Sequence, residues 1–210
     1  MREFELERNF FKDFRSKCMK IQNREIVNEF VKAIEHLLKE YDTSIYENRF
    51  IAGGVIEYIF IALLKALGFN ASHLGEKDKR TDIAVEYGGN ELKFSIKTNF
   101  TGKGDIRLIN KLGKGSKIFW DEPTIFLISG LGIVYADSRF LGDRTIDKGD
   151  AIVINVNSIK IFSDENSDYK VNLEIPVKSE ISPSFHTASF DIAKSVLERS
   201  NSKILIKYLS

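Results

Sequence analysis

Apolar residues in the first third of the chain recur at helical spacing. Ile26, Phe30 and Ile34 follow one another at every fourth position, which places them on one face of a helix. The pattern predicts three helices, over residues 4–19, 24–41 and 50–67. Gly68 follows the third, and glycine is the residue best suited to a left-handed C-terminal cap. We therefore expect a helical N-terminal part that ends at this glycine.

After Gly68 the pattern changes to short apolar runs bounded by turn residues. Residues 70–74 and, more clearly, 81–87 are typical of strands, and residues 91–99 of an antiparallel partner for the second. The Gly-Gly-Asn sequence at residues 88–90 is typical of a tight hairpin turn. The sequence therefore predicts a helix followed by a β-hairpin.

Residues 101–117 are rich in glycine and in positive charge. They contain four glycines, and five Lys or Arg side chains against one aspartate. This composition predicts a loop and a short helix over the sheet. Glycines in such a loop would let backbone amides approach phosphates closely. We call residues 101–117 the basic strip.

The C-terminal half is predicted to be mostly strand. A Gly-Leu-Gly turn at residues 130–132 joins strands over 124–129 and 133–136. Further strands are expected over residues 151–156, 159–162, 170–175 and 203–208. One helix is expected over residues 189–199, with Ser189 as its N-cap. This order predicts an α/β or α+β fold, with helices covering a mixed sheet.

The composition is that of an ordinary globular protein without a membrane span. The chain has 210 residues, 29% charged and 43% hydrophobic, which suits one domain with a sizeable core. A net charge of +1 excludes a histone-like polycation but not a local basic surface. Cys18 is the only cysteine, which favours a reducing, cytoplasmic compartment. The most apolar stretch, residues 50–69, is interrupted by Glu57 and Lys65, and the N-terminus is too charged for a signal peptide.

Hairpin symmetry brings three polar side chains together. If the chain turns at residues 88–89, Asp82 lies opposite Ser95, and Lys97 follows one pleat further on the same face. The carboxylate could hold a hard divalent cation, while the ammonium orients an attacking water and offsets charge on a phosphate. The alternative is a structural ion pair between Asp82 and Lys97 at the edge of the sheet.

A glutamate on the third predicted helix belongs to the same region. Glu57 is surrounded by Val55, Ile56 and Ile59, so it lies on or beside a buried face. A partly buried carboxylate needs a partner, and where this helix packs on the hairpin a metal ion or Lys97 could supply it. The alternative is that Glu57 reaches solvent at the boundary of the face.

The order of these elements resembles the PD-(D/E)xK nuclease superfamily, and type II restriction endonucleases most. The resemblance rests on Glu57 in "RFIAGGVIEYIFIALLKALGF", on Thr81-Asp82, and on Ser95-Ile96-Lys97 in "LKFSIKTNF". It implies a restriction-endonuclease-like αβββαβ core, with a mixed central sheet flanked by helices and an N-terminal helical extension. The expected single nuclease domain, residues 1–210, consists of the extension (1–45), the catalytic core (49–136) and C-terminal strands and helix (150–210).

Two positions depart from the family's pattern. Thr81 stands where the family has proline, which is a common replacement. Ser95 stands where the family has a second acid, and a hydroxyl is a much weaker ligand for a hard cation than a carboxylate. The missing negative charge has to come from elsewhere if the site is active.

Three sources could restore the acid: Glu57 on the helix, Asp105 in the following loop, or a different working tripeptide, Glu91-Leu92-Lys93. Hairpin symmetry favours Ser95-Ile96-Lys97 together with Glu57, because it places Ser95 rather than Glu91 opposite Asp82.

The resemblance implies site-specific hydrolysis of double-stranded DNA with Mg²⁺, leaving 5′-phosphates, by a homodimer in a prokaryotic cytoplasm. Asp82, Glu57 and the main-chain carbonyl of Ile96 would hold the metal ion, and Lys97 would position the attacking water. One alternative is a repair, junction or modification-dependent nuclease of the same fold. Another is a DNA-binding relative that has lost catalysis, which the serine at position 95 suggests.

The basic strip is where we expect DNA to bind. Arg107 and Asn110 have the chemistry to read guanine and adenine edges, respectively. The predicted DNA-binding residues are Lys103, Arg107, Asn110, Lys111, Lys114, Lys117, Lys79 and Arg80. The alternative is a solvated loop without a ligand. His36, His73 and His186 have no evident nucleophile partner and are expected to be surface or packing residues.

Overall fold

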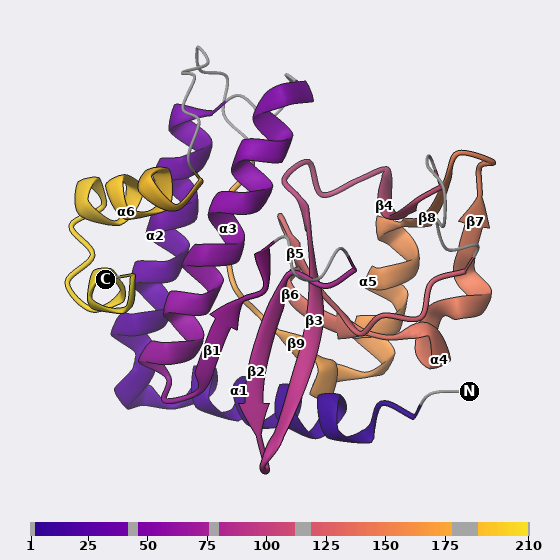
Figure 1. Ribbon diagram of the computed structural model, residues 1–210, viewed down its shortest axis with the longest axis horizontal. Coiled ribbons are helices and arrows are strands. Elements are labelled where there is room, and N and C mark those ends of the chain that lie inside the picture. Colours follow the sequence, from indigo (N-terminus) through magenta and orange to yellow (C-terminus); the bar gives the residue numbers. More distant parts are fainter. Residues whose placement is uncertain (1–2, 42–45, 76–79, 112–118, 178–188, 210) are drawn as a thin grey trace.

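Two long helices stand beside a twisted sheet, and a third helix runs across its lower end (Figure 1). The computed structural model describes residues 3–41, 46–75, 80–111, 119–177 and 189–209; of residues 46–50 and 189–192 it describes the backbone alone. Within these residues, the chain forms a mixed α/β structure in which helices flank a mixed central sheet.

The three predicted N-terminal helices are confirmed as α1 (Glu5–Met19), α2 (Arg24–Glu40) and α3 (Tyr46–Ala66), with a short 3₁₀ turn (Ile21–Asn23) between the first two. The predicted glycine cap is also confirmed, since Gly68 has a φ of +83°. The N–H of Phe69 donates to the carbonyl of Leu64 (3.0 Å), which satisfies an end carbonyl of α3. No helix in the described ranges is long and apolar enough to cross a membrane.

A six-stranded sheet, in the order β1-β2-β3-β5-β6-β9, forms the centre of the molecule. Its strands are β1 (Asn70–His73), β2 (Ile83–Tyr87), β3 (Asn90–Asn99), β5 (Thr124–Ile128), β6 (Gly132–Ala136) and β9 (Lys170–Val171). Neighbouring strands are antiparallel except β3 and β5, which are parallel. A parallel pair needs a crossover connection. The described part of this connection contains a strand, β4, where the resemblance implies a helix.

The hairpin between β2 and β3 has the predicted register. Ile83 lies opposite Phe94, and Tyr87 opposite Asn90. Gly88 and Gly89 both have positive φ, +58° and +78°, as a tight turn that matches the strand twist requires. The pairing that brings Asp82 beside Ser95 is therefore confirmed.

The main hydrophobic core lies between the helices and one face of this sheet. Phe10, Phe11 and Phe14 of α1 are fully buried. Phe10 packs against Phe94 of β3, with ring centroids 5.1 Å apart, and Phe11 against Tyr135 of β6, at 5.6 Å. These aromatic contacts anchor α1 to the sheet.

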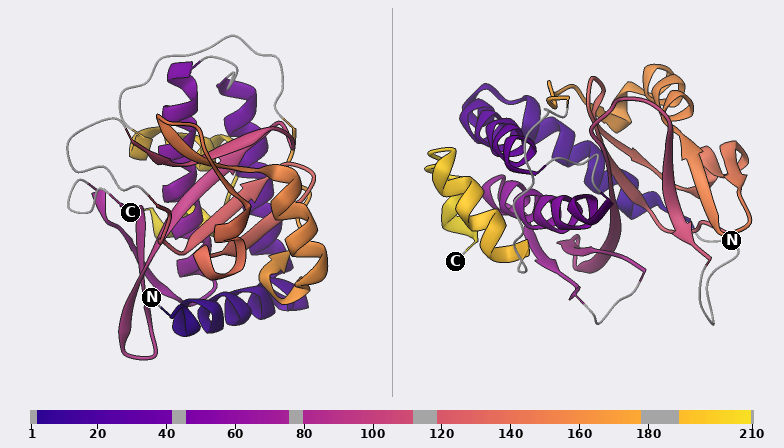
Figure 2. Two further views of the ribbon diagram at one scale, coloured as in Figure 1. Left: turned by 90° about the vertical axis from the view of Figure 1, so that its right-hand side faces the viewer. Right: turned by 90° about the horizontal axis from the view of Figure 1, so that it is seen from above.

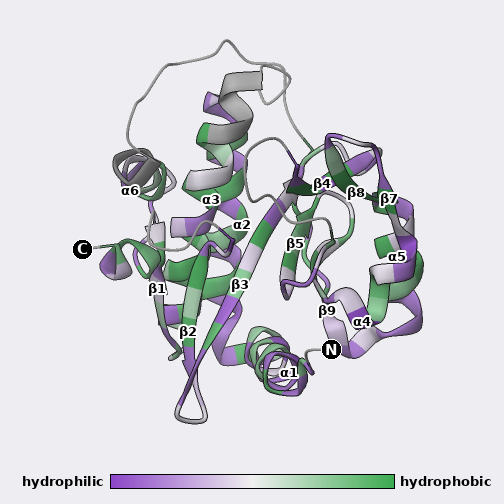
Figure 3. Cartoon of the chain, turned by 45° about the vertical axis from the view of Figure 1, so that its right-hand side comes forward, coloured by the Kyte–Doolittle hydropathy of each residue, from purple (hydrophilic) through white to green (hydrophobic). Residues whose placement is uncertain are grey.

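A second, three-stranded sheet covers the other face of β5 and β6. It has the order β4-β8-β7 and consists of β4 (Asp105–Asn110), β8 (Ala151–Asn155) and β7 (Thr145–Asp147). Alternate residues of β5 point to opposite cores: Ile125 and Leu127 to the helices, Phe126 and Ile128 to the second sheet. β5 therefore lies buried between two layers (Figures 2 and 3). The helices α4 (Ser138–Leu141) and α5 (Val156–Glu165) and a 3₁₀ turn (Gly142–Arg144) adjoin this sheet.

The prediction of a loop for the basic strip is confirmed at residues 101–104, but the prediction is wrong at residues 105–110. Residues 105–110 form strand β4, because Ile106 and Leu108 alternate with polar residues and enter the second core. The glycines that suggested a loop lie outside this strand, and a β-bulge between Arg107 and Ile109 disturbs its alternation. Residues 112–118 lie outside the described residues.

Two further strand predictions are wrong. Residues 159–162 belong to helix α5, whose first turn is capped by Asn155, which accepts a hydrogen bond from the N–H of Asn157 (3.0 Å). Residues 205–208 form a 3₁₀ turn instead of a strand. The strand expected over residues 170–175 is limited to β9, which follows another 3₁₀ turn (Ser167–Tyr169). The helix over residues 189–199 is confirmed as α6 (Ser189–Arg199).

Candidate active site

Asp82 is fixed by its backbone between two strands. Its N–H donates to the carbonyl of Phe94 (2.9 Å), and its own carbonyl accepts from the N–H of Leu74 (3.0 Å). Its side chain turns to β3, where Oδ2 accepts hydrogen bonds from the N–H of Ile96 (2.6 Å) and the hydroxyl of Ser95 (3.0 Å). The carboxylate is therefore held in one orientation beside the middle of β3.

Lys97 lies one pleat beyond Ser95 on the same face of β3, because side chains alternate along a strand. Its side chain is half-buried, yet its ammonium makes no ion pair or hydrogen bond within the described part of the chain. The structural ion pair with Asp82 is therefore not formed. A half-buried ammonium that makes no hydrogen bond is suited to an anionic ligand.

Glu57 of α3 faces the same region. Its side chain is 19% exposed, and its Oε2 lies 2.7 Å from Nε2 of His73. Burial, and then the negative charge of Asp82, raise the pKa of Glu57; the hydrogen bond from His73 and the positive charge of Lys97 act against that rise. The geometry agrees: His73, which contacts Glu57, lies opposite Ile83, the residue after Asp82, and the N–H of Leu74 donates to the carbonyl of Asp82. One helix and two strands therefore converge on a single site.

His73 is the residue of this site that the sequence did not reveal. It ends β1, lies opposite Ile83, and its ring stacks on Tyr58 with centroids 4.5 Å apart and an angle of 11° between the planes. The N–H of Gly75 donates to its Nδ1 (2.9 Å). Its place opposite the start of β2, next to Asp82, was the signal that could have revealed it, but the register of so short a strand is weakly specified by sequence.

The other two sources of an acid do not lie at this site. Asp105 accepts hydrogen bonds from Lys148 (2.5 Å) and Asn155 (2.8 Å) within the second sheet. Glu91 and Lys93 lie towards the hairpin turn, where the two side chains are 3.7 Å apart. Of the three sources, only Glu57 is close to Asp82.

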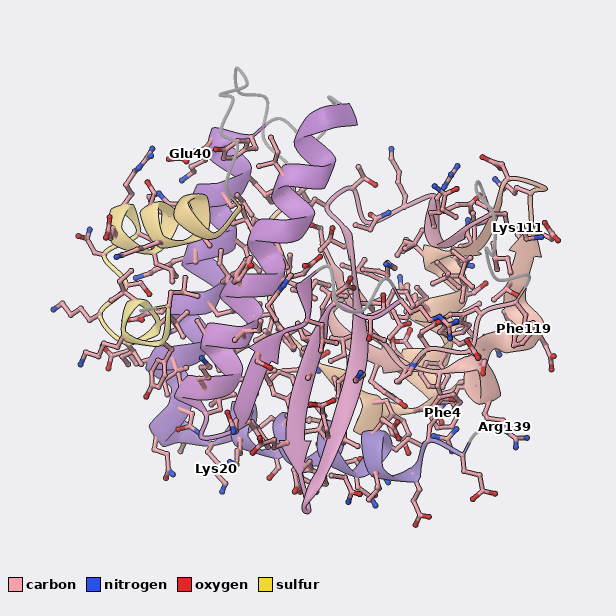
Figure 4. The ribbon with its side chains drawn as sticks, in the orientation of Figure 1. Phe4, Lys20, Glu40, Lys111, Phe119 and Arg139 are labelled. Carbon is pink, nitrogen blue, oxygen red and sulfur yellow. The ribbon has the colours of Figure 1, made fainter. Side chains whose placement is uncertain are left out.

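Two of the predicted DNA-binding residues that the structure describes pair with carboxylates. Arg107 pairs with Asp150 (3.0 Å), and Lys111 pairs with Asp147 (2.5 Å) beside β7, on the side of the molecule away from α2 (Figure 4). The described members with exposed side chains are Arg107, Lys103, Asn110 and Arg80. Those outside the described residues are Lys79, Lys114 and Lys117. Asp147 at the end of β7 and Asp150 in the turn after it thus offset part of the charge expected of the basic strip.

The donor set fits a hard divalent cation such as Mg²⁺. Glu57 and Asp82 are two neighbouring carboxylates, whose mutual repulsion a cation would relieve. In a strand, the N–H and carbonyl of one residue point to the same side, so the carbonyl of Ile96 points to the side of Asp82. In the described ranges no group of three or more His, Cys, Asp or Glu side chains is placed to hold a metal ion. Mg²⁺ keeps several waters and needs only one or two carboxylates.

Comparisons with protein-family models, with curated proteins and with solved structures find no match for this chain. The function therefore has to be argued from the residues of the site.

Proposed function

We propose that this protein is a site-specific endonuclease of the type II restriction class that hydrolyses double-stranded DNA with Mg²⁺ and leaves 5′-phosphates. The observation that carries the proposal is that two carboxylates, Glu57 and Asp82, lie in the same region as a half-buried lysine, Lys97, whose ammonium makes no hydrogen bond or ion pair within the described structure. Paired carboxylates suit a cation, and a free ammonium suits a phosphate.

Each residue has a definite part in the proposed chemistry. Asp82, Glu57 and the carbonyl of Ile96 hold the cation, which when bound would polarise the phosphate and lower the pKa of its water. Lys97 donates a hydrogen bond to the attacking water and offsets the negative charge that builds on the phosphorus oxygens. Ser95 donates to Asp82 and so orients that carboxylate.

The arrangement of elements supports the same assignment. Helix α3 supplies a carboxylate, the antiparallel strands β1, β2 and β3 follow it, and β5 then runs parallel to β3. This order resembles the one expected of a restriction-endonuclease-like core, except that the described part of the crossover contains the strand β4. We further propose that the enzyme acts as a homodimer in a prokaryotic cytoplasm, as restriction enzymes that cut both strands of a palindrome do.

Incubation of phage DNA with the purified protein, with Mg²⁺ or with EDTA, tests the proposal. We expect discrete fragments that carry 5′-phosphates with Mg²⁺, and intact DNA with EDTA. A smear would contradict site specificity, and cutting confined to four-way junctions or modified DNA would favour a repair or modification-dependent enzyme. Tight metal-independent binding without cleavage would indicate the inactive relative that the serine at position 95 suggests.

A further inference from the structure

The hydrogen bonds of His73 define the position of its proton. A backbone N–H can only donate, so Nδ1, which receives the N–H of Gly75 at 2.9 Å, has to be the unprotonated nitrogen of the neutral ring. The proton of the neutral ring then lies on Nε2, 2.7 Å from Oε2 of Glu57. His73 is therefore a donor to the carboxylate of Glu57.

The orientation of the imidazole plane is also fixed. Tyr58 follows Glu57 on α3, and its ring stacks nearly parallel on His73, with centroids 4.5 Å apart. The imidazole is thus held from one side by a residue of the helix and from its edge by the backbone of Gly75. Its side chain is 22% exposed. These contacts specify where the oxygens of Glu57 lie.

We infer that His73 is a positioning residue, which fixes Glu57 so that Oε1 can bind the same cation as Asp82. The inference rests on the proposed function. Oε2 is occupied by His73, and no described residue makes a hydrogen bond to Oε1. Hydrogen bonds that orient a metal-binding side chain typically change metal affinity by about 10- to 100-fold when they are removed. A nuclease whose tripeptide has serine in place of its acid depends on Glu57, and so on His73, more than one that keeps both acids.

Direct titration with Mn²⁺, followed by electron paramagnetic resonance, tests this role without relying on activity. We expect His73→Ala to bind Mn²⁺ about 10- to 100-fold more weakly than the wild type. His73→Gln should recover part of the affinity, because a side-chain amide can also donate to Glu57. His36→Ala is the matched control: His36 lies on α2, is half-buried, and should leave the affinity unchanged.

Cleavage and stability provide the second readout. In His73→Ala the Mg²⁺ concentration for half-maximal cleavage should rise by a similar factor, while the rate at saturating Mg²⁺ and the thermal midpoint change little. Wild-type Mn²⁺ affinity in His73→Ala would overturn the inference and leave the nuclease proposal standing. Absence of Mn²⁺ binding by the wild type would overturn both. A merely structural histidine would lower the midpoint in both His73 variants without a selective change in metal affinity.

Discussion

At the scale of single residues, the site depends on how the carboxylate of Asp82 is held and charged. Two donors occupy Oδ2, the N–H of Ile96 and the hydroxyl of Ser95, so this oxygen is fixed before any ligand arrives. An oriented carboxylate binds a cation without the cost of ordering a free side chain. The charge of Asp82 and its fixed orientation therefore contribute separately to the binding of a cation.

Asp82→Asn separates them, because the amide keeps the shape and an acceptor oxygen but loses the charge. We expect Mn²⁺ binding to weaken by on the order of 4 kcal/mol, roughly a thousandfold, which is the scale of one charge interaction about 4 Å apart near a protein surface. Titration calorimetry measures this loss. The matched control is Glu86→Gln, an exposed carboxylate of β2 that accepts from Asn70 and should have no effect. Equal affinities of the Asp82→Asn variant and the wild type would exclude Asp82 as a ligand.

The part of the site that depends on local geometry was predictable from the sequence. Asp82, Ser95 and Lys97 follow from a two-residue turn, because such a turn fixes the register of the hairpin. The contact of His73 with Glu57 was not predictable from the sequence, because it depends on how β1 and α3 pack. The pairing of Arg107 with Asp150 joins residues far apart in the chain, which no local pattern reveals.

At the scale of elements, buried carboxylates connect segments that are distant in sequence. Asp137 is fully buried and caps α4, while Arg8 of α1 donates to both of its oxygens at 2.9 Å. Tyr135 donates to the same carboxylate. This bond network fixes α1 to the end of β6, and so supports the aromatic packing of α1 on the sheet.

A second buried carboxylate fixes the C-terminal 3₁₀ turn (Leu205–Tyr208) to α2. Glu29 accepts hydrogen bonds from the hydroxyl of Ser202 and from the N–H groups of Lys203, Ile204 and Leu205. Burial alone would raise the pKa of Glu29, but these hydrogen bonds outweigh it and the pKa is lowered. A depressed pKa in the folded state means that the carboxylate stabilises the protein above the ordinary glutamate pKa, and that this stabilisation is lost as the pH falls through the folded value.

Glu29→Gln should therefore lower the free energy of unfolding at pH 7 by about 1.5–3 kcal/mol, the scale of hydrogen bonds to a charged group. The difference from the wild type should remain constant down to the ordinary glutamate pKa of about 4.3 and shrink below it. Urea denaturation at a series of pH values measures it. Glu25→Gln, an exposed change in the first turn of the same helix, is the control. A difference that does not vary with pH would contradict the role given to the charge.

The same segments show why some elements were not predictable. Residues 205–208 have a strand-like composition but form a 3₁₀ turn. The backbone N–H groups of Ile204 and Leu205 donate to Glu29, which is distant in the sequence. Residues 159–162 consist of three apolar residues and Lys160, and so short a run does not distinguish helix from strand. Long periodic segments such as α2 and the glycine-capped α3 were predictable without knowledge of distant contacts, because their hydrophobic pattern and the residues at their ends indicate the same element.

At the scale of the whole molecule, the site lies beside α3 at the end of the hairpin away from its turn, and the chain continues from β3 into the second sheet. β3 carries Lys97, and β4 follows after a short turn in which the side chain of Asn99 accepts from the N–H groups of Thr101 and Gly102. This turn connects the residues proposed for catalysis directly to Lys103 and Arg107. The proposed catalytic residues and the predicted DNA-binding residues would thus be joined through one ordered connection.

The central claim is that Lys97 acts on a phosphate beside a cation, and the most direct measurement compares the cleavage of phage DNA by two lysine variants of the same strand. With saturating Mg²⁺, Lys97→Ala should cut at least about 10²–10³-fold more slowly than the wild type, because it loses a donor to developing charge, while its affinity for DNA persists. Lys93→Ala should cut normally, since Lys93 lies towards the hairpin turn beside Glu91. Wild-type cleavage by Lys97→Ala, or cleavage lost only in Lys93→Ala, would contradict the account.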